Sequence, residues 1–116
     1  MIATRDSIIK ADDLTTSTVT TDEWGTVRIR TMTGAERDEF DAMIVRNKNA
    51  KQFHDPTEVR ARLVVLCAID ESGARLFTEE DIPQLQQKAA KPLGAVADAI
   101  AALNGLDGEE DIEKNS

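Results

Sequence analysis

Residues 55–69 constrain the fold of this chain most, because they contain its longest apolar run, residues 63–69. The segment begins like a helix: Asp55 suits the N-cap position, and Pro56 suits the first helical position, where its missing N–H group costs nothing. The second half is apolar on nearly every side, which predicts a buried helix over residues 55–69. A buried strand is the alternative, since part of the run is β-branched, but the start signals and the length favour a helix.

The composition predicts one small domain with an aliphatic core. The chain has 116 residues, and only 3% of them are aromatic, so binding to nucleic acid by base stacking is disfavoured. We expect residues 1–106 to form this domain. Residues 107–116 carry five acidic residues and one lysine, and we expect them to form a disordered tail.

The net charge of −8 bears on the partners of the chain. Binding to DNA or RNA depends on basic side chains that neutralise phosphates, so the acidic balance argues against a nucleic-acid partner. It also disfavours a membrane surface, and no apolar stretch approaches the roughly 20 residues that span a bilayer. The first residues lack the apolar core of a signal peptide, and Cys67 is the only cysteine. We therefore expect a cytoplasmic protein with a reduced thiol.

The N-terminal third predicts a short helix followed by a β-hairpin. The helix is expected within residues 5–13, with Ile8 and Ile9 as its apolar contacts. Residues 14–32 are β-prone on both sides of a turn at residues 22–25. An isolated hairpin is marginal in water, so we expect it to pack on helices or on a partner. The side chains assigned to its buried face are Val19, Val27 and Ile29, and those assigned to its outer face are Arg28 and Arg30.

A second helix is predicted from Thr33 to about Asn47. Thr33 suits the N-cap, and Glu36 stands three residues later, which is the spacing of a capping box. A polar, basic linker at residues 47–52 then leads to the central helix. The apolar stripe of this second helix consists of Phe40, Met43 and Ile44.

The C-terminal part predicts two more helices. Residues 78–81 repeat the capping signal, and a final helix begins near Pro92 and ends at Asn104 and Gly105. The apolar stripe of the first of these helices consists of Ile82, Leu85 and Ala89.

Residues 75–77, between the central helix and the third capping signal, are expected to be extended. They form either a minor strand or an anchor that places Leu76 and Phe77 in the core. The predicted fold is therefore α+β, mostly α, with an N-terminal β-hairpin packed on a bundle of about four helices.

Residues able to carry out chemistry are few. His54 is the only histidine, and it lies at the opposite end of the predicted central helix from Cys67. A zinc site needs three or four ligands, and a nucleophilic cysteine needs an adjacent base, so neither is predicted. The acidic cluster at residues 79–81 is explained by the helix dipole. We therefore expect no catalytic residue, no metal site and no cofactor, and a protein that is not an enzyme.

Candidate binding residues lie on the hairpin and around the linker. Trp24 at the hairpin turn is the kind of exposed aromatic side chain that anchors interfaces, although packing back over the helices is equally consistent with the sequence. The basic residues near the linker suit a charge-complementary contact, with a solvated surface as the alternative. The candidate partner-binding residues are Trp24, Arg28, Arg30, Arg46, Lys48 and Lys51.

Four segments of the chain follow the pattern of a known family: Glu23-Trp24-Gly25, residues 27–40 (VRIRTMTGAERDEF), residues 60–82 (RARLVVLCAIDESGARLFTEEDI) and Leu103-Asn104-Gly105-Leu106. In these segments the chain resembles the tail assembly chaperones of long-tailed bacteriophages, which act with the tape-measure protein. The likeness covers about residues 5–106. It is a pattern of strand, caps and core and contains no catalytic signature.

The resemblance implies a non-enzymatic chaperone in the cytoplasm of an infected bacterial host, absent from the mature virion. Such a protein binds the long, helical tape-measure protein, keeps it soluble and helps recruit tail-tube subunits; homo-oligomerisation is compatible with this role. Many family members have a longer form made by ribosomal frameshifting, and an A-rich slippery run encoding residues 113–115 is a hypothesis that the gene sequence tests. The alternative, from a different class, is a small acidic adaptor or antitoxin-like module that binds one protein partner.

Overall fold

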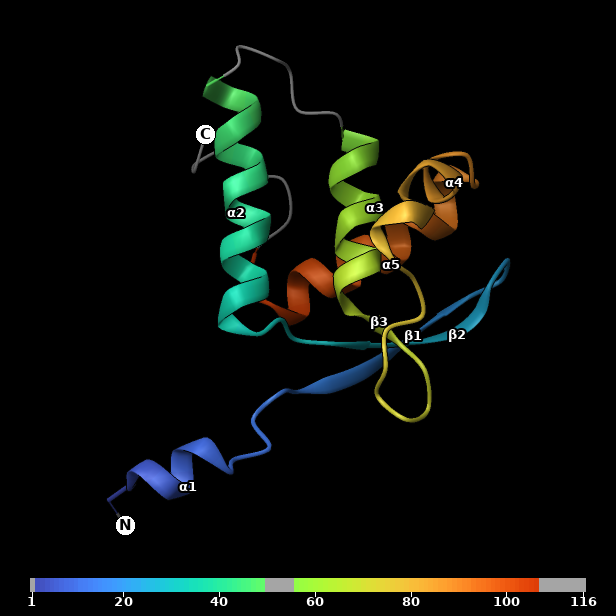
Figure 1. Cartoon of the computed structure of the whole chain (residues 1–116). Helices are drawn as coiled ribbons and strands as arrows, with labels where there is room; N and C mark the ends of the chain where they lie inside the picture. Colours follow the sequence, from blue (N-terminus) through green and yellow to red (C-terminus); the bar gives the residue numbers. More distant parts are fainter. Residues whose placement is uncertain (1, 50–55, 107–116) are drawn as a thin grey trace.

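The computed structural model describes residues 2–49 and 56–106. Within them, a three-stranded antiparallel sheet lies beside five α-helices, which confirms the predicted α+β class (Figure 1). The elements in chain order are α1 (Arg5–Ile9), β1 (Thr16–Thr21), β2 (Gly25–Arg30), α2 (Gly34–Asn49), α3 (Pro56–Cys67), β3 (Ala68–Ile69), the 3₁₀ helix η1 (Glu79–Asp81), α4 (Ile82–Gln86) and α5 (Ala90–Leu103).

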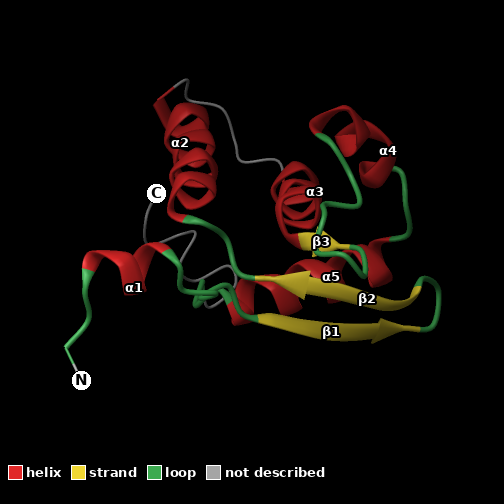
Figure 2. Cartoon of the chain, turned by 60° about the horizontal axis from the view of Figure 1, so that its bottom comes forward, coloured by secondary structure: helices red, strands yellow, loops and turns green. Residues whose placement is uncertain are grey.

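Strands β1 and β2 form the predicted hairpin, with Thr21 opposite Gly25 at the turn (Figure 2). Val19 and Val27 face each other across the two strands and are partly buried against the core. Ile29 is fully buried. Helix α5 contacts both strands, so the hairpin packs on a helix as expected.

The central segment forms helix α3, but the helix ends at Cys67, and the prediction that it continues to Ile69 is wrong. Ala68 and Ile69 instead form strand β3, in which they pair with Ile29 and Arg28 of strand β2. Strand pairing satisfies the backbone groups of these buried residues without a further helical turn. The sheet therefore gains a third strand that the sequence did not predict. The proposed N-cap residue, Asp55, lies outside the described residues.

Most of helix α3 is buried, as its apolar composition predicts. The buried residues of this helix are Val59, Ala61, Leu63, Val64, Val65, Leu66 and Cys67. Helix α5 packs across α3, and α2 stands beside α3 in both views (Figures 1 and 2). These three helices supply most of the aliphatic core.

Helix α2 begins with the predicted capping box. The backbone N–H of Glu36 donates to Thr33 Oγ1 at 3.1 Å, and the backbone N–H of Thr33 donates to Glu36 Oε1 at 2.8 Å. The helix continues to Asn49, so its end is later than predicted and Lys48 belongs to the helix and not to a linker. The expected apolar stripe is confirmed, because all its members are buried, namely Phe40, Met43 and Ile44.

The C-terminal helices form as predicted, with different bounds. Thr78 and Asp81 make the expected capping box, but it opens the 3₁₀ helix η1, which leads into α4. Helix α4 ends at Gln86, so Ala89 is exposed and is not part of its apolar stripe. Helix α5 ends as expected before Gly105, whose φ of 70° lies in the left-handed region that favours glycine.

Helix α1 stands apart from the rest of the fold (Figures 1 and 2). The expectation that Ile8 and Ile9 make buried contacts is wrong, since these residues are 60% and 69% exposed. The helix is held by local chemistry: the side chain of Thr4 accepts from the backbone N–H of Ser7, and the side chain of Ser7 accepts from that of Thr4. Capping therefore accounts for this helix where burial does not.

Candidate functional site

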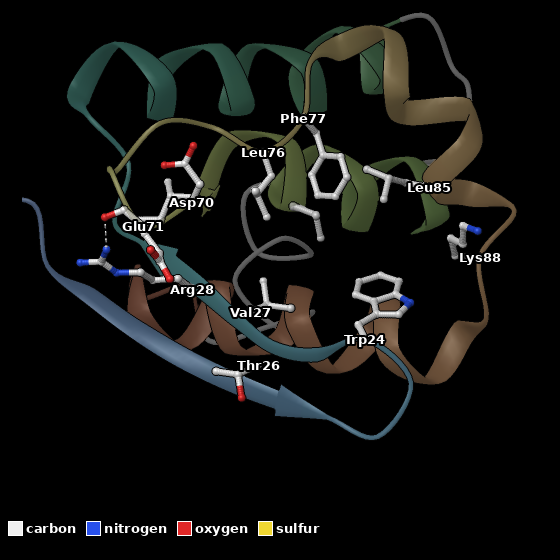
Figure 3. Close-up of a pocket in the computed structure, with 12 residues that line it drawn as sticks. Trp24, Thr26, Val27, Arg28, Asp70, Glu71, Leu76, Phe77, Leu85 and Lys88 are labelled. Carbon is white, nitrogen blue, oxygen red and sulfur yellow. Dashed lines mark hydrogen bonds between the residues drawn. The ribbon is translucent and has the colours of Figure 1, made fainter.

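An open groove of about 640 Å³ lies between strand β2, helix α3, the loop of residues 70–77 and helix α4 (Figure 3). Its floor and walls are mainly apolar. The apolar side chains that line it include Trp24, Val27, Ile69, Leu76, Phe77 and Leu85. Grooves of this kind, apolar with a few polar groups at the margin, are typical of binding sites.

The hairpin turn holds Trp24 at one end of the groove (Figure 3). Thr21 fixes the turn, because its Oγ1 accepts from the backbone N–H of Trp24 at 2.8 Å and donates to the carbonyl oxygen of Gly25 at 3.3 Å. Gly25 has a φ of 78°, which a residue with a side chain rarely adopts. Trp24 is partly buried against the core, so it forms part of the groove wall and still presents surface to the groove.

The loop of residues 70–77 forms the opposite wall, and its backbone is fixed by hydrogen bonds. Asp70 Oδ1 accepts from the backbone N–H and hydroxyl of Ser72 and from the backbone N–H of Ala74. The Ser72 hydrogen bond lowers the pKa of the Asp70 carboxyl. The backbone N–H of Leu76 donates to the carbonyl oxygen of Ala68 at 3.0 Å. The wall is therefore a structured loop that is tied to strand β3.

Leu76 is 48% exposed, so its predicted role as a core anchor is wrong. Its side chain lies in the groove beside that of Phe77, which is only partly buried (Figure 3). The alternative prediction is a minor strand at residues 75–77. The structure has a single β-bridge there, between Arg75 and Ile69, and no full strand. A half-exposed leucine on an ordered loop, beside partly exposed aromatic side chains, is the strongest local indication of a binding site among the described residues.

Charged residues stand at the margins of the groove. Asp70, Glu71 and Arg28 lie at one end, where Arg28 Nη1 donates to the carbonyl oxygen of Glu71 at 2.9 Å (Figure 3). Lys88 lies at the other end, near Leu85. The groove is therefore apolar in the middle and polar at both ends, which suits an occupant with an apolar stripe and polar flanks.

Arg30 is not part of the groove, and its expected outward position is wrong. Its Nη1 and Nη2 donate to Glu36 Oε1 and Oε2, both at 2.8 Å, and its side chain is only 12% exposed. Arg75 also donates to Glu36 Oε2. The hydrogen bond from Arg30 holds the pKa of Glu36 well below its ordinary value, and the same bond raises the pKa of Arg30. This cluster joins strand β2, helix α2 and the groove wall, so its role is structural.

The structure brings together two of the six candidate binding residues, Trp24 and Arg28. Arg46 is exposed on helix α2, outside the groove lining. Lys48 belongs to helix α2, but its side chain lies outside the described part of the structure, as does the whole of Lys51.

Sequence reasoning missed the apolar groove residues on the loop and on helix α4. Leu76, Phe77 and Leu85 look like core residues in the sequence, and Leu85 is indeed buried. The only usable signal was position: Leu76 follows a Gly-containing turn and precedes a capping box, so it lies outside any helical stripe. Its exposure depends on how the loop crosses strand β3, which no local pattern encodes.

Cys67 is buried, and its surroundings do not favour the thiolate form. Burial raises the pKa of its thiol to about 11, so the reactive thiolate is scarce at neutral pH. The side chain of Asn104 contacts its sulfur at 3.9 Å and also accepts from the backbone N–H of Met32 at 2.8 Å. These contacts tie the end of α5 to the end of α3 and to the segment before α2.

Among residues 2–49 and 56–106, no cluster of three or more His, Cys, Asp and Glu side chains is arranged to hold a metal ion. In the same ranges, no helix combines the length and apolar character needed to cross a bilayer. His54 lies outside the described residues. Comparisons of the chain with known protein families, with curated proteins and with solved structures found no match.

Proposed function

We propose that this chain is a non-enzymatic tail assembly chaperone of a long-tailed bacteriophage, acting in the cytoplasm of the infected host. It binds the tape-measure protein, keeps it soluble and helps recruit tail-tube subunits, and it is absent from the finished virion. The resemblance of the sequence to that family supports the proposal, and the apolar groove between β2, the 70–77 loop and α4 is the observation that carries it.

The groove matches the physical need of such a chaperone. A long helical protein exposes an apolar stripe before assembly, and burying that stripe prevents aggregation. The groove offers Leu76 and Phe77, with Trp24 at one end, to such a stripe. Large aromatic and aliphatic side chains of this kind supply most of the energy of binding in protein interfaces.

The surface around the groove keeps the complex in solution. The chain carries a net charge of −8, and a net charge far from zero favours solubility. The polar margins, with Asp70 and Glu71 at one end and Lys88 at the other, are positioned to meet the polar flanks of the bound helix. Arg28 therefore belongs to the polar margin of the groove, and Arg30 stabilises the fold through its ion pair with Glu36.

Co-expression tests the proposal. The probe is the tape-measure protein encoded in the same gene cluster, produced in bacteria with and without this chain. We expect the soluble fraction of the tape-measure protein to rise severalfold with the chain and the two proteins to purify together. An unchanged soluble fraction would contradict the chaperone function.

The gene neighbourhood gives an independent check. A tail-tube gene upstream and a very long helical gene downstream are expected. If both genes are absent and purification from the native host captures one small unrelated protein, the adaptor or antitoxin-like alternative replaces the chaperone.

A further inference from the structure

Two apolar surfaces of this chain stand open at opposite ends of the hairpin. One is the groove, where Leu76 is about half exposed. The other is the N-terminal arm, defined here as residues 2–14, on which helix α1 exposes Ile8 and Ile9. We propose that the arm of one copy docks its Ile8 and Ile9 side chains into the groove of a second copy.

Helix α1 of the arm is already formed and capped in the free chain. Thr4 and Ser7 cap helix α1 reciprocally, through backbone-to-side-chain hydrogen bonds of 2.9 and 3.2 Å. A helix of five residues is marginal in water without packing, and no residue of this helix is buried within the described chain. An apolar surface on a second molecule supplies the missing packing for Ile8 and Ile9.

In its described position, helix α1 lies beyond the end of the hairpin that is farther from Trp24, where it faces a neighbouring molecule and not its own groove. The arm joins the hairpin at Thr16, which pairs with Arg30 at the open end of the two strands. The groove lies toward the other end, where Trp24 follows the turn. Strand β1 has six residues and so separates these two ends by about 20 Å. Figures 1 and 2 show α1 extending away from the hairpin, beyond the end opposite the β1–β2 turn.

The groove has room for both isoleucine side chains. Ile8 and Ile9 are successive residues, so their side chains leave helix α1 about 100° apart, and the open groove of about 640 Å³ would take them between Trp24 and Leu76. The interface is small compared with the roughly 1,200 Å² and more of stable complexes, so the association is weak and depends on concentration.

The contact joins two different surfaces, so it is heterologous. After one arm has docked, the first copy still has a free groove and the second copy a free arm, and further copies can add in the same way. The arm also occupies the site assigned above to the partner protein, so partner and arm compete for the groove. The contact between copies itself does not depend on the proposed chaperone function.

Sedimentation velocity of the chain alone tests the contact, from about 10 μM to about 1 mM, the range in which weak interfaces form. We expect the weight-average mass of the wild type to rise with concentration. The double variant Ile8→Asp/Ile9→Asp, which lacks the arm face, and the groove variant Leu76→Asp should each remain monomeric. Val45→Asp is the matched control, because Val45 is also 48% exposed but lies on α2, outside the groove lining; it should associate like the wild type.

Mixing the two defective proteins gives the decisive result. The Ile8→Asp/Ile9→Asp variant keeps an intact groove and the Leu76→Asp variant an intact arm, so the mixture should form one-to-one dimers and nothing larger. The fluorescence of Trp24, the only tryptophan, should shift to shorter wavelength in the arm-defective chain when its groove is filled. Circular dichroism verifies that each variant folds, and Leu76→Lys replaces Leu76→Asp if the latter does not.

A wild type that remains monomeric to about 1 mM would overturn the proposal. So would a mixture of the two variants that forms no dimer, because the contact would then involve two like surfaces. These measurements use the chain alone, so a negative result would overturn the contact between copies but not the chaperone function. A negative co-expression experiment would overturn the chaperone function but not the contact between copies.

Discussion

Arg30 and Glu36 form a two-pronged ion pair that joins strand β2 to the first turn of helix α2, with both N–O distances at 2.8 Å. Arg75, the residue before Leu76, donates to the same carboxylate. One buried acidic group therefore fixes the strand, the helix and the wall of the groove relative to one another. The two partners are each only 12% exposed, so solvent and salt screen the pair little.

Replacing Glu36 with Gln should lower the free energy of unfolding at neutral pH by about 3 kcal/mol, because it leaves the guanidinium of Arg30 buried without its counter-charge. Denaturant-induced unfolding, followed by circular dichroism, measures this loss. Glu39→Gln is the matched control, since Glu39 is exposed on the same helix. Its effect should remain within about 0.5 kcal/mol.

The effect of Glu36→Gln should also depend on pH. The folded pKa of Glu36 is lowered, so its stabilisation is present above the unfolded pKa of about 4.3 and is lost as the pH falls through the folded pKa. The difference in unfolding free energy between wild type and variant should therefore shrink below about pH 4. A difference that stays constant as the pH falls would show that the ion pair is not its source.

Two glycines in and after helix α5 should respond oppositely to alanine. Gly94 lies inside the helix with no atom near the position of an added Cβ, so Gly94→Ala should raise the unfolding free energy by about 0.5–1 kcal/mol. Gly105 has the same free space but a φ of 70°, so Gly105→Ala should lower it by about 1 kcal/mol. Thermal unfolding of both variants measures the difference, and shifts of the same sign would mean that the end of α5 is misplaced.

Cys67 should be unreactive toward a chromogenic disulfide reagent while the protein is folded at neutral pH. Burial raises its pKa to about 11 and also blocks access, whereas an unfolded chain has an ordinary thiol pKa of about 8.5. Labelling should accelerate at least about 100-fold in denaturant. Equal rates with and without denaturant would indicate that Cys67 is at the surface.

Local sequence signals predicted the starts of the elements well. The capping pairs Thr33 with Glu36 and Thr78 with Asp81 both form, because each depends on residues only three positions apart. The stripe of Phe40, Met43 and Ile44 is buried as expected, because helical periodicity fixes which residues share a face.

The failures concern features that depend on distant residues. Ala68 and Ile69 form a strand because β2 is there to pair with them, and two residues are too few for a recognisable strand pattern. Ile8 and Leu76 look like core residues, yet their burial depends on whether another element covers them. The groove exists only through the arrangement of a hairpin, a loop and two helices, so the sequence yielded two of its margin residues and not its apolar middle.

The most direct test of the groove as the binding site compares Leu76→Asp with Val45→Asp in co-expression with the tape-measure protein of the same gene cluster. Both positions are 48% exposed in the wild type, so both variants should fold, but only Leu76 lines the groove. We predict that Leu76→Asp reduces the soluble tape-measure protein to the level found without the chaperone and that Val45→Asp matches the wild type. A folded Leu76→Asp variant that still keeps the tape-measure protein soluble would contradict the assignment of the groove.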